Sequence, residues 1–213
     1  MTEDTLAAAD GRTSRRRATS GRLRAAALGL FAERGYSATS VDDIARRARV
    51  SRGSLFYNFG SKRGLGRAVV VEAAERVAAT ARQAREGRSG WSALDAVVGA
   101  VLREFDADPA TCRVLVGELF RAERPWHDDL PAARAAVLAP ITEVVAEVAA
   151  ERPGAHHPRP ESHHDHIAMA ILGAVVFCAL DRMTYAPDGG LDDLHDALMA
   201  TVRGLLDPDD SVV

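Results

Sequence analysis

Apolar residues recur at intervals of three and four along most of the chain, which is the spacing of one face of an α-helix. Clear stripes run from Leu23 to Phe31, from Leu65 to Val77 and from Leu191 to Leu205. The alternation of apolar and polar residues that is typical of β-strands is nowhere sustained. The pattern predicts an all-α fold of about nine helices.

Start and stop signals divide the first 85 residues into three shorter helices and a long one. The first helix begins at residue 21, and Gly35 is placed to cap its C-terminus. Ser40 and Asp43 have the spacing of a capping box and predict a second helix over 40–47. A third is expected over 51–58, and Ser61 is placed to cap the fourth.

The rest of the chain is expected to form five further amphipathic helices, with a loop at 86–90 before them. We expect a flexible basic arm over 1–20, a three-helix domain over 21–66 and a larger helical domain over 67–213. The five expected helices cover 91–105, 110–121, 129–151, 162–184 and 191–206.

Charge is unevenly distributed along the chain. Residues 11–67 contain fourteen basic and three acidic residues, a net charge of +11. The whole chain has 27 basic and 30 acidic residues, so the remainder carries −14. This asymmetry favours a polyanionic partner for the N-terminal part over a merely solvated cationic surface.

The two short helices at 40–47 and 51–58 have the proportions of a helix-turn-helix. In that motif the N-terminal residues of the second helix meet base edges in the major groove. Arg52 can donate two hydrogen bonds to guanine, and Gly53 lets the backbone approach DNA closely. Hydroxyl, amide and ammonium groups nearby can bind phosphate oxygens. These groups belong to Ser51, Ser54, Tyr57, Asn58 and Lys62.

The run RAAALGLFAERGYSATSVDDIARRARVSRGSLFYNFGSKRGL, residues 24–65, resembles the DNA-binding domain of TetR-family transcriptional regulators. The matching features are LFAERGY, the IA pair of the second helix, VSRGSL and F-Y-N-F-x-S-K-x-x-L. The resemblance implies a homodimeric repressor that leaves a palindromic operator when a small molecule binds. It makes 21–66 the DNA-binding domain and 67–213 the ligand-binding and dimerisation domain. The expected DNA-contacting residues are Ser40, Arg49, Ser51, Arg52, Gly53, Ser54, Tyr57, Asn58 and Lys62.

Two positions depart from the family pattern. The turn between the two short helices usually contains glycine where this chain has Arg49. If that backbone is left-handed, arginine costs about 1 kcal/mol, which a phosphate contact can offset. The usual histidine before the last aromatic residue is Asn58 here, which still donates a hydrogen bond but carries no charge.

The resemblance also implies that the last two helices pair with those of a second copy. Small residues on one and a leucine stripe on the other suit such a four-helix bundle. The expected interface residues are Ala170, Gly173, Ala174, Leu194, Leu198 and Leu205. An effector pocket should be mainly apolar with few polar groups. Its expected lining residues are Trp91, Phe105, Leu115, Glu118, Leu119, Trp126, Met169 and Phe177.

Several residues outside these sets suggest other chemistry. The basic residues Arg12 and 15–17 could follow phosphates or a minor groove, or belong to a disordered polar tail. The histidines of 156–166 are metal-ligand types, but no pair has the four-residue spacing of two ligands on one helix face. We expect a solvated loop there, no metal and no cofactor.

Cys112 and Cys178 are expected to be reduced thiols in a cytoplasmic protein. The apolar run at 167–180 is short for a membrane span and suits a buried helix, so no membrane partner is expected. Because no nucleophile–base pair or phosphate-binding glycine loop is found, we expect no enzyme. Two alternatives stay open: a metal-dependent enzyme using the cluster from His156 to His166, and a non-specific architectural DNA-binding protein.

Overall fold

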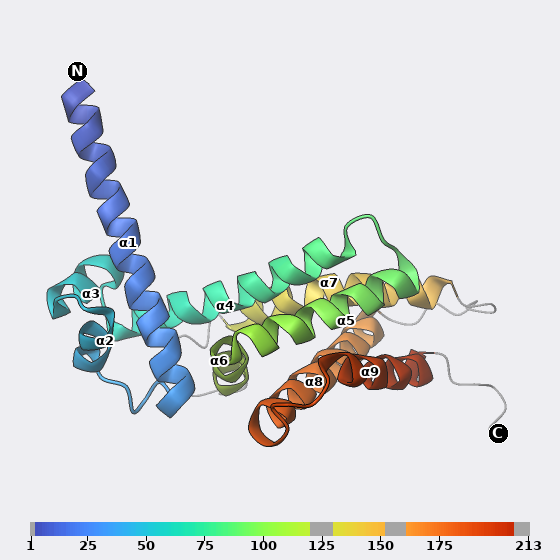
Figure 1. Cartoon of the computed structure of the whole chain (residues 1–213). Helices are drawn as coiled ribbons and strands as arrows, with labels where there is room; N and C mark the ends of the chain where they lie inside the picture. Colours follow the sequence, from blue (N-terminus) through green and yellow to red (C-terminus); the bar gives the residue numbers. More distant parts are fainter. Residues whose placement is uncertain (1–2, 120–129, 152–160, 207–213) are drawn as a thin grey trace.

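The computed structural model describes residues 3–119, 130–151 and 161–206, which form nine α-helices and no strand (Figure 1). The prediction of an all-α fold is confirmed. The helices are α1 (Glu3–Arg34), α2 (Val41–Ala48), α3 (Arg52–Phe59), α4 (Lys62–Arg85), α5 (Gly90–Ala107), α6 (Pro109–Leu119), α7 (Leu130–Ala150), α8 (Glu161–Tyr185) and α9 (Leu191–Leu206).

The second half of α1, α2, α3 and the start of α4 form a small N-terminal head around one apolar core. Leu23, Ile44, Leu55 and Leu65, one from each helix, are fully buried. The predicted signals bound these helices. Gly35 has φ +80°, Ser40 and Asp43 form a complete capping box, and the Ser61 hydroxyl accepts from the Gly64 N–H at 3.0 Å.

The first helix is longer than the sequence indicated. It begins at Glu3 instead of residue 21, so residues 3–20, expected to belong to a flexible arm, are helical. No proline interrupts this segment, and alanine is frequent in it. Gly11 and Gly21 each cost a helix only about 1 kcal/mol, which a helix anchored in the head tolerates. The extension projects beyond α2 and α3 (Figure 1).

Helix α4 joins the head to the C-terminal body. Its 24 residues span about 36 Å at the rise of an α-helix, and its later part packs against α5 and α7. Charged side chains fix both ends of this packing. Arg76 reaches Glu104 and Asp108 at the junction of α5 and α6, and Arg85 reaches Glu147 of α7.

Helix α6 lies between the head and the interior of the body. Val114 packs into the core of the head together with Leu130 of α7. The next two residues, Leu115 and Val116, line a small cavity in the body. One turn of α6 therefore contacts both parts of the chain.

Helix α8 leaves much of its apolar surface uncovered. Phe177 and Tyr185 are 75% and 81% exposed, and Ala170 and Gly173 also face outward. The span from His163 to Tyr185 is long and apolar enough to cross a membrane by length and composition alone, and 28% of its apolar 18-residue window is buried within the chain. The run at 167–180, expected to suit a buried helix, is therefore buried on one side and exposed on the other.

Candidate nucleic-acid interface

The turn between α2 and α3 is held by a left-handed arginine. Arg49 has φ 54° and ψ 48°, the left-handed conformation that costs an arginine about 1 kcal/mol. Its N–H donates to Arg46 O at 3.2 Å, and the Val50 N–H donates to Ala45 O at 3.0 Å. These two bonds are those of a Schellman motif, which ends α2 sharply. The Arg49 side chain is exposed.

The N-terminal end of α3 is capped and open to solvent. The Ser51 hydroxyl accepts from the Ser54 N–H at 3.2 Å and lies 2.9 Å from the Ser54 hydroxyl. Gly53 is exposed, and a Cβ placed on it would meet only the Ser51 hydroxyl, at 3.8 Å. The packing of the head therefore does not require glycine here, but close approach by a partner would.

Arg52 lies beside this end of α3 with its guanidinium held between two groups. Its Nη1 is 3.5 Å from Asp42 Oδ1, and its guanidinium carbon is 5.8 Å from the centre of the Phe56 ring. Both members of the ion pair are largely exposed, so the pair contributes little to stability. Asp42 instead limits the directions in which the guanidinium points.

The other predicted phosphate-binding residues differ in their surroundings. Tyr57 is 75% exposed, as expected of a contact residue. The Lys62 ammonium lies 4.1 Å from the centre of the Tyr36 ring, so a cation–π contact positions it. Asn58 is half-buried, and its amide donates to Ser54 O at 2.8 Å. One of its donors is thus already used within α3.

Ser40 supports the motif from the start of α2. Its hydroxyl and its N–H both donate to Asp43 Oδ2, at 2.7 and 3.1 Å. These hydrogen bonds, the hydroxyl first, lower the pKa of Asp43 well below its usual range, with help from Arg46 and Arg34. The carboxylate is therefore charged at neutral pH and fixes the N-terminus of α2.

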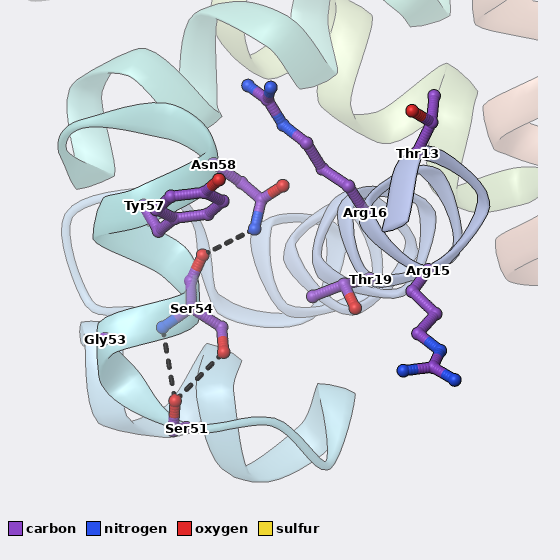
Figure 2. A pocket seen from close by; sticks show the side chains of 9 residues that line it. All are labelled: Thr13, Arg15, Arg16, Thr19, Ser51, Gly53, Ser54, Tyr57 and Asn58. Atoms are coloured by element: carbon purple, nitrogen blue, oxygen red, sulfur yellow. Dashed lines mark hydrogen bonds between the residues drawn. The ribbon is translucent and has the colours of Figure 1, made fainter. Parts of the chain in front are cut away.

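Five of the nine predicted residues, Ser51, Gly53, Ser54, Tyr57 and Asn58, lie together beside the helical extension of α1. An open groove of about 780 Å³ separates the extension from α3 (Figure 2). The groove is lined by Thr13, Arg15, Arg16 and Thr19 of α1, and by Ser51, Gly53, Ser54, Tyr57 and Asn58. Arg16 stands over the Tyr57 ring, with 5.6 Å between the guanidinium carbon and the ring centre.

Sequence reasoning missed three features of this face. It did not assign Asp42 as the partner of Arg52, Tyr36 as the partner of Lys62, or Thr13 and Thr19 as lining residues. The last pair carries a signal: Thr19, Arg16 and Thr13 continue the three- and four-residue spacing of the Leu23 stripe. The Tyr36–Lys62 contact joins residues far apart in sequence and has no such signal.

The body contains a small apolar cavity of about 60 Å³. Three of the expected pocket residues, Phe105, Leu115 and Met169, line it. Its other lining residues are Val116, Arg134, Val137, Leu172, Gly173 and Val176. The cavity lies between α5, α6, α7 and α8.

The other expected pocket residues do not line this cavity. Phe177 points outward from α8 and is 75% exposed, so its assignment to the pocket is wrong. Trp91 packs half-buried against the main core, and Glu118 is buried but does not line the cavity. Trp126 and the side chain of Leu119 lie outside the described residues.

Some of the residues expected at the dimer interface are exposed, and others are buried within the chain. Ala170 and Gly173 are exposed on α8, Ala174 is half-buried, and Leu194 is half-buried against the main core. Leu198 is 4% exposed and belongs to the core of its own chain, so its assignment to an interface is wrong. The side chain of Leu205 lies outside the described residues.

The histidines and cysteines form no metal site or disulfide within the described ranges. No group of three or more His, Cys, Asp or Glu side chains there could hold a metal ion; His156 and His157 lie outside those ranges. His163 and His164 stack edge to face at 6.4 Å. Cys112 and Cys178 are free thiols, and burial raises the pKa of Cys112 to about 12.

These features define a helix-turn-helix protein in which a basic head presents the start of one short helix, joined to a larger helical domain. Residues 23–69 match the model of bacterial regulatory proteins of the tetR family. Residues 23–69 of the chain therefore form a domain similar to that of the tetR family.

Known relatives support the same assignment. A 39-residue segment of the chain is 44% identical to IcaR of Staphylococcus aureus, a helix-turn-helix negative transcriptional regulator of a biofilm operon. That match covers 18% of this chain and 21% of IcaR. The chain matches about a third or less of the length of the curated relatives.

Two solved structures share the whole fold. A TetR-like transcriptional regulator from Rhodococcus sp. RHA1 superposes with a TM-score of 0.68 at 22% identity, over 88% of this chain and 95% of that chain. The regulator FadR from Bacillus subtilis, solved with stearoyl-CoA, gives 0.71 at 15% identity, over 85% and 96%. At these identities the likeness establishes the fold alone.

Proposed function

We propose that the chain is a homodimeric transcriptional repressor that binds a palindromic operator through its head and leaves it when an effector binds the body. The observation that carries the proposal is the outward face of α3. Arg52 and Tyr57 are both exposed there, in a segment with a net charge of +11. A duplex docked on this face would meet a guanidinium at base edges and donors at the phosphates.

The uncovered face of α8 supports the homodimer. Ala170, Gly173 and Phe177 recur along one side of α8, and Ala197, Thr201 and Gly204 are exposed on α9. Small side chains allow two helix pairs to approach closely, while Phe177 would be buried in the contact. Packing this apolar face against the same face of a second copy would remove it from water.

The cavity supports an apolar effector. Eight of its nine lining residues are apolar, and Arg134 is the one charged group. A volume of about 60 Å³ holds at most a few water molecules, so a larger effector must enlarge the cavity. The FadR structure holds stearoyl-CoA in the same fold, which supports a ligand with an apolar chain.

Helix α6 supplies a direct connection from cavity to head. An effector that displaces Leu115 or Val116 must also move Val114, which is packed in the core of the head. Arg76 ties the same region to α4 through Asp108 and Thr111. A ligand that favours the displaced α6 would change the spacing of the two heads in a dimer and lower operator affinity.

The proposal is tested by selecting bound duplexes from a random DNA pool with the full chain. We expect a palindrome with half-sites about one helical turn apart. Tyr57→Phe and Lys62→Ala should each weaken binding while the dimer stays folded. Arg52→Ala should relax base preference more than overall affinity.

A ratio of specific to non-specific affinity above roughly a thousand separates a repressor from an architectural protein. Enrichment of no sequence would refute sequence-specific binding. Operator affinity unchanged in both Tyr57→Phe and Lys62→Ala would refute the contact assignment.

A further inference from the structure

The small cavity of the body has one charged residue in its lining. Arg134 of α7 borders it together with apolar residues of α5, α6, α7 and α8. We propose that the effector is an amphipathic carboxylate: its alkyl or aryl part fills the cavity, and its carboxylate pairs with the Arg134 guanidinium at the opening. The inference rests on the proposed function, which gives the cavity an apolar effector, and it adds the chemical class of that effector and the residue that selects it.

The position of Arg134 places a charge at the edge of the cavity instead of inside it. Arg134 lines the cavity and is also exposed to solvent. An arginine does both when its methylene stem borders an apolar space and its guanidinium reaches water. A carboxylate bound at this guanidinium would keep part of its hydration, so it would avoid the large cost of burying a charge completely.

Arg134 differs from the arginines that hold the body together. Arg76, Arg85 and Arg182 each form an ion pair with a carboxylate of another helix. The Arg134 side chain forms no ion pair and no hydrogen bond with any residue that the structure describes. A guanidinium presents paired N–H donors in a planar arrangement that matches a carboxylate. A carboxylate ligand would therefore supply the partner that the other three arginines find within the chain.

The surroundings disfavour a cationic effector. The nine lining residues include no carboxylate. Glu118 of α6 is buried, with 3% exposure, but it does not line the cavity. An ammonium group would meet Arg134 as a like charge and would find no acidic partner in the lining. Charge therefore favours an anion at the opening.

The cavity can grow on the side formed by α8. A cavity of about 150 Å³ is enough to hold benzene, so the present volume of about 60 Å³ takes only part of such a group. Met169 is half-buried, and its unbranched side chain adapts easily to a new neighbour. Gly173 leaves open space, because a Cβ built on it would meet no atom within 4 Å. A short alkyl chain or one ring could therefore enter without displacing the fully buried Phe105.

The test measures direct binding of small molecules to the full chain in the absence of DNA. The probes are butanoate, hexanoate and octanoate, with octanol and octylamine as the uncharged and cationic analogues of octanoate. The variants are Arg134→Gln, Arg134→Lys and Val116→Phe; the last narrows the cavity from α6, where Val116 lines it. Arg113→Gln is the matched control, because Arg113 is also an exposed arginine of the body but does not line the cavity.

Affinity for the acids should increase about fourfold for each added methylene until the cavity is full. Arg134→Gln should weaken octanoate binding roughly tenfold, to the level of octanol, which lies between the effects of an exposed ion pair and of a hydrogen bond to a charged group. Arg134→Lys should recover part of this loss, and Arg113→Gln should bind as the wild type does. Val116→Phe should weaken octanoate and octanol alike, because it acts on the apolar part of both.

Octanol or octylamine bound by the wild type as tightly as octanoate would overturn the inference, and so would no binding of any acid. Equal losses in Arg134→Gln and Arg113→Gln would show a general charge effect and would overturn it too. Unchanged octanoate affinity in Val116→Phe would place the acid outside the cavity, for example on the exposed face of α8.

Two further measurements separate this inference from the functions on which it depends. Octanoyl-CoA that binds tightly and is indifferent to Arg134→Gln would assign the cavity to thioesters instead of carboxylates. Release of the selected operator is measured with octanoate in a separate assay. If octanoate binds through Arg134 and the operator stays bound, the carboxylate site stands and the proposed effector-controlled release fails.

Discussion

Replacing Arg49 with glycine separates backbone strain from DNA contact at the turn of the motif. Arg49 has a left-handed backbone, and its N–H and that of Val50 complete the Schellman motif that ends α2. A non-glycine residue in this conformation costs about 1–2 kcal/mol. Glycine loses about 0.5–1 kcal/mol more entropy on folding, so the net stabilisation from Arg49→Gly should be about 0.5–1 kcal/mol.

For a chain of this size, that gain corresponds to an increase in Tm of about 1–4 °C. Thermal unfolding should be measured at one fixed protein concentration, since the proposed dimerisation would make Tm depend on concentration. Arg49→Ala is the matched control because it removes the charge but keeps a Cβ on the left-handed backbone. We expect Arg49→Ala to have the stability of the wild type to within about 0.5 kcal/mol.

DNA binding should not rank Arg49→Gly and Arg49→Ala as stability does. If the Arg49 guanidinium binds a phosphate, both variants lose about 0.9 from the salt slope of operator binding. Equal stability of the glycine and alanine variants would refute the account of strain. A wild-type salt slope in both variants would show that Arg49 does not touch the backbone of DNA.

Four further substitutions or reactions follow from the structure. Gly53→Ala should leave the head folded, or stabilise α3 by up to about 1 kcal/mol, yet weaken operator binding; unchanged affinity would show that DNA stays away from this position. Ser40→Ala should cost about 1 kcal/mol in urea denaturation at neutral pH. The pKa of Asp43 is lower in the folded state than in the unfolded state, so its carboxylate stabilises the fold fully above about pH 4, the unfolded pKa. This stabilisation is lost as the pH falls through the folded pKa. The difference in free energy of unfolding between Ser40→Ala and the wild type should therefore become smaller in acid. Asp42→Asn should strengthen binding to all duplexes and reduce discrimination at the base that Arg52 contacts; a change confined to the operator would argue against a general charge effect. Cys112 should resist a thiol reagent in the native protein at pH 8 and react on unfolding, because its buried thiol stays protonated; prompt native labelling would contradict its burial.

Local signals predicted the head well because they act within a few residues. Ser40 and Asp43 form the expected capping box, Gly35 has the expected positive φ, and Leu55 is buried as its helical position implied. The same local reasoning gave the left-handed backbone of Arg49 as a conditional expectation, and the structure has it. The start of α1 was predicted too late, because the sequence has no strong helix-breaking residue near residue 20 that marks where the helix begins or ends.

Residues of the body were harder to assign because an apolar stripe does not say what covers it. Leu198 belongs to a regular stripe, yet it packs inside its own chain instead of reaching a second copy. Helix α8 is apolar on most faces, so nothing local distinguished outward Phe177 from inward Met169. The contact of Tyr36 with Lys62 depends on tertiary packing and could not be predicted from spacing.

Val114 of α6 and Leu130 of α7 complete the core of the head. A fragment ending after α4 lacks both side chains, so the part of the apolar core that they cover would be exposed to solvent. We expect such a fragment to be less stable than the head within the intact chain. Chimeras that join this head to the body of another regulator should function only if the new body supplies side chains of matching shape at both places. Recombination between relatives would then exchange heads and bodies less freely than their separate roles suggest.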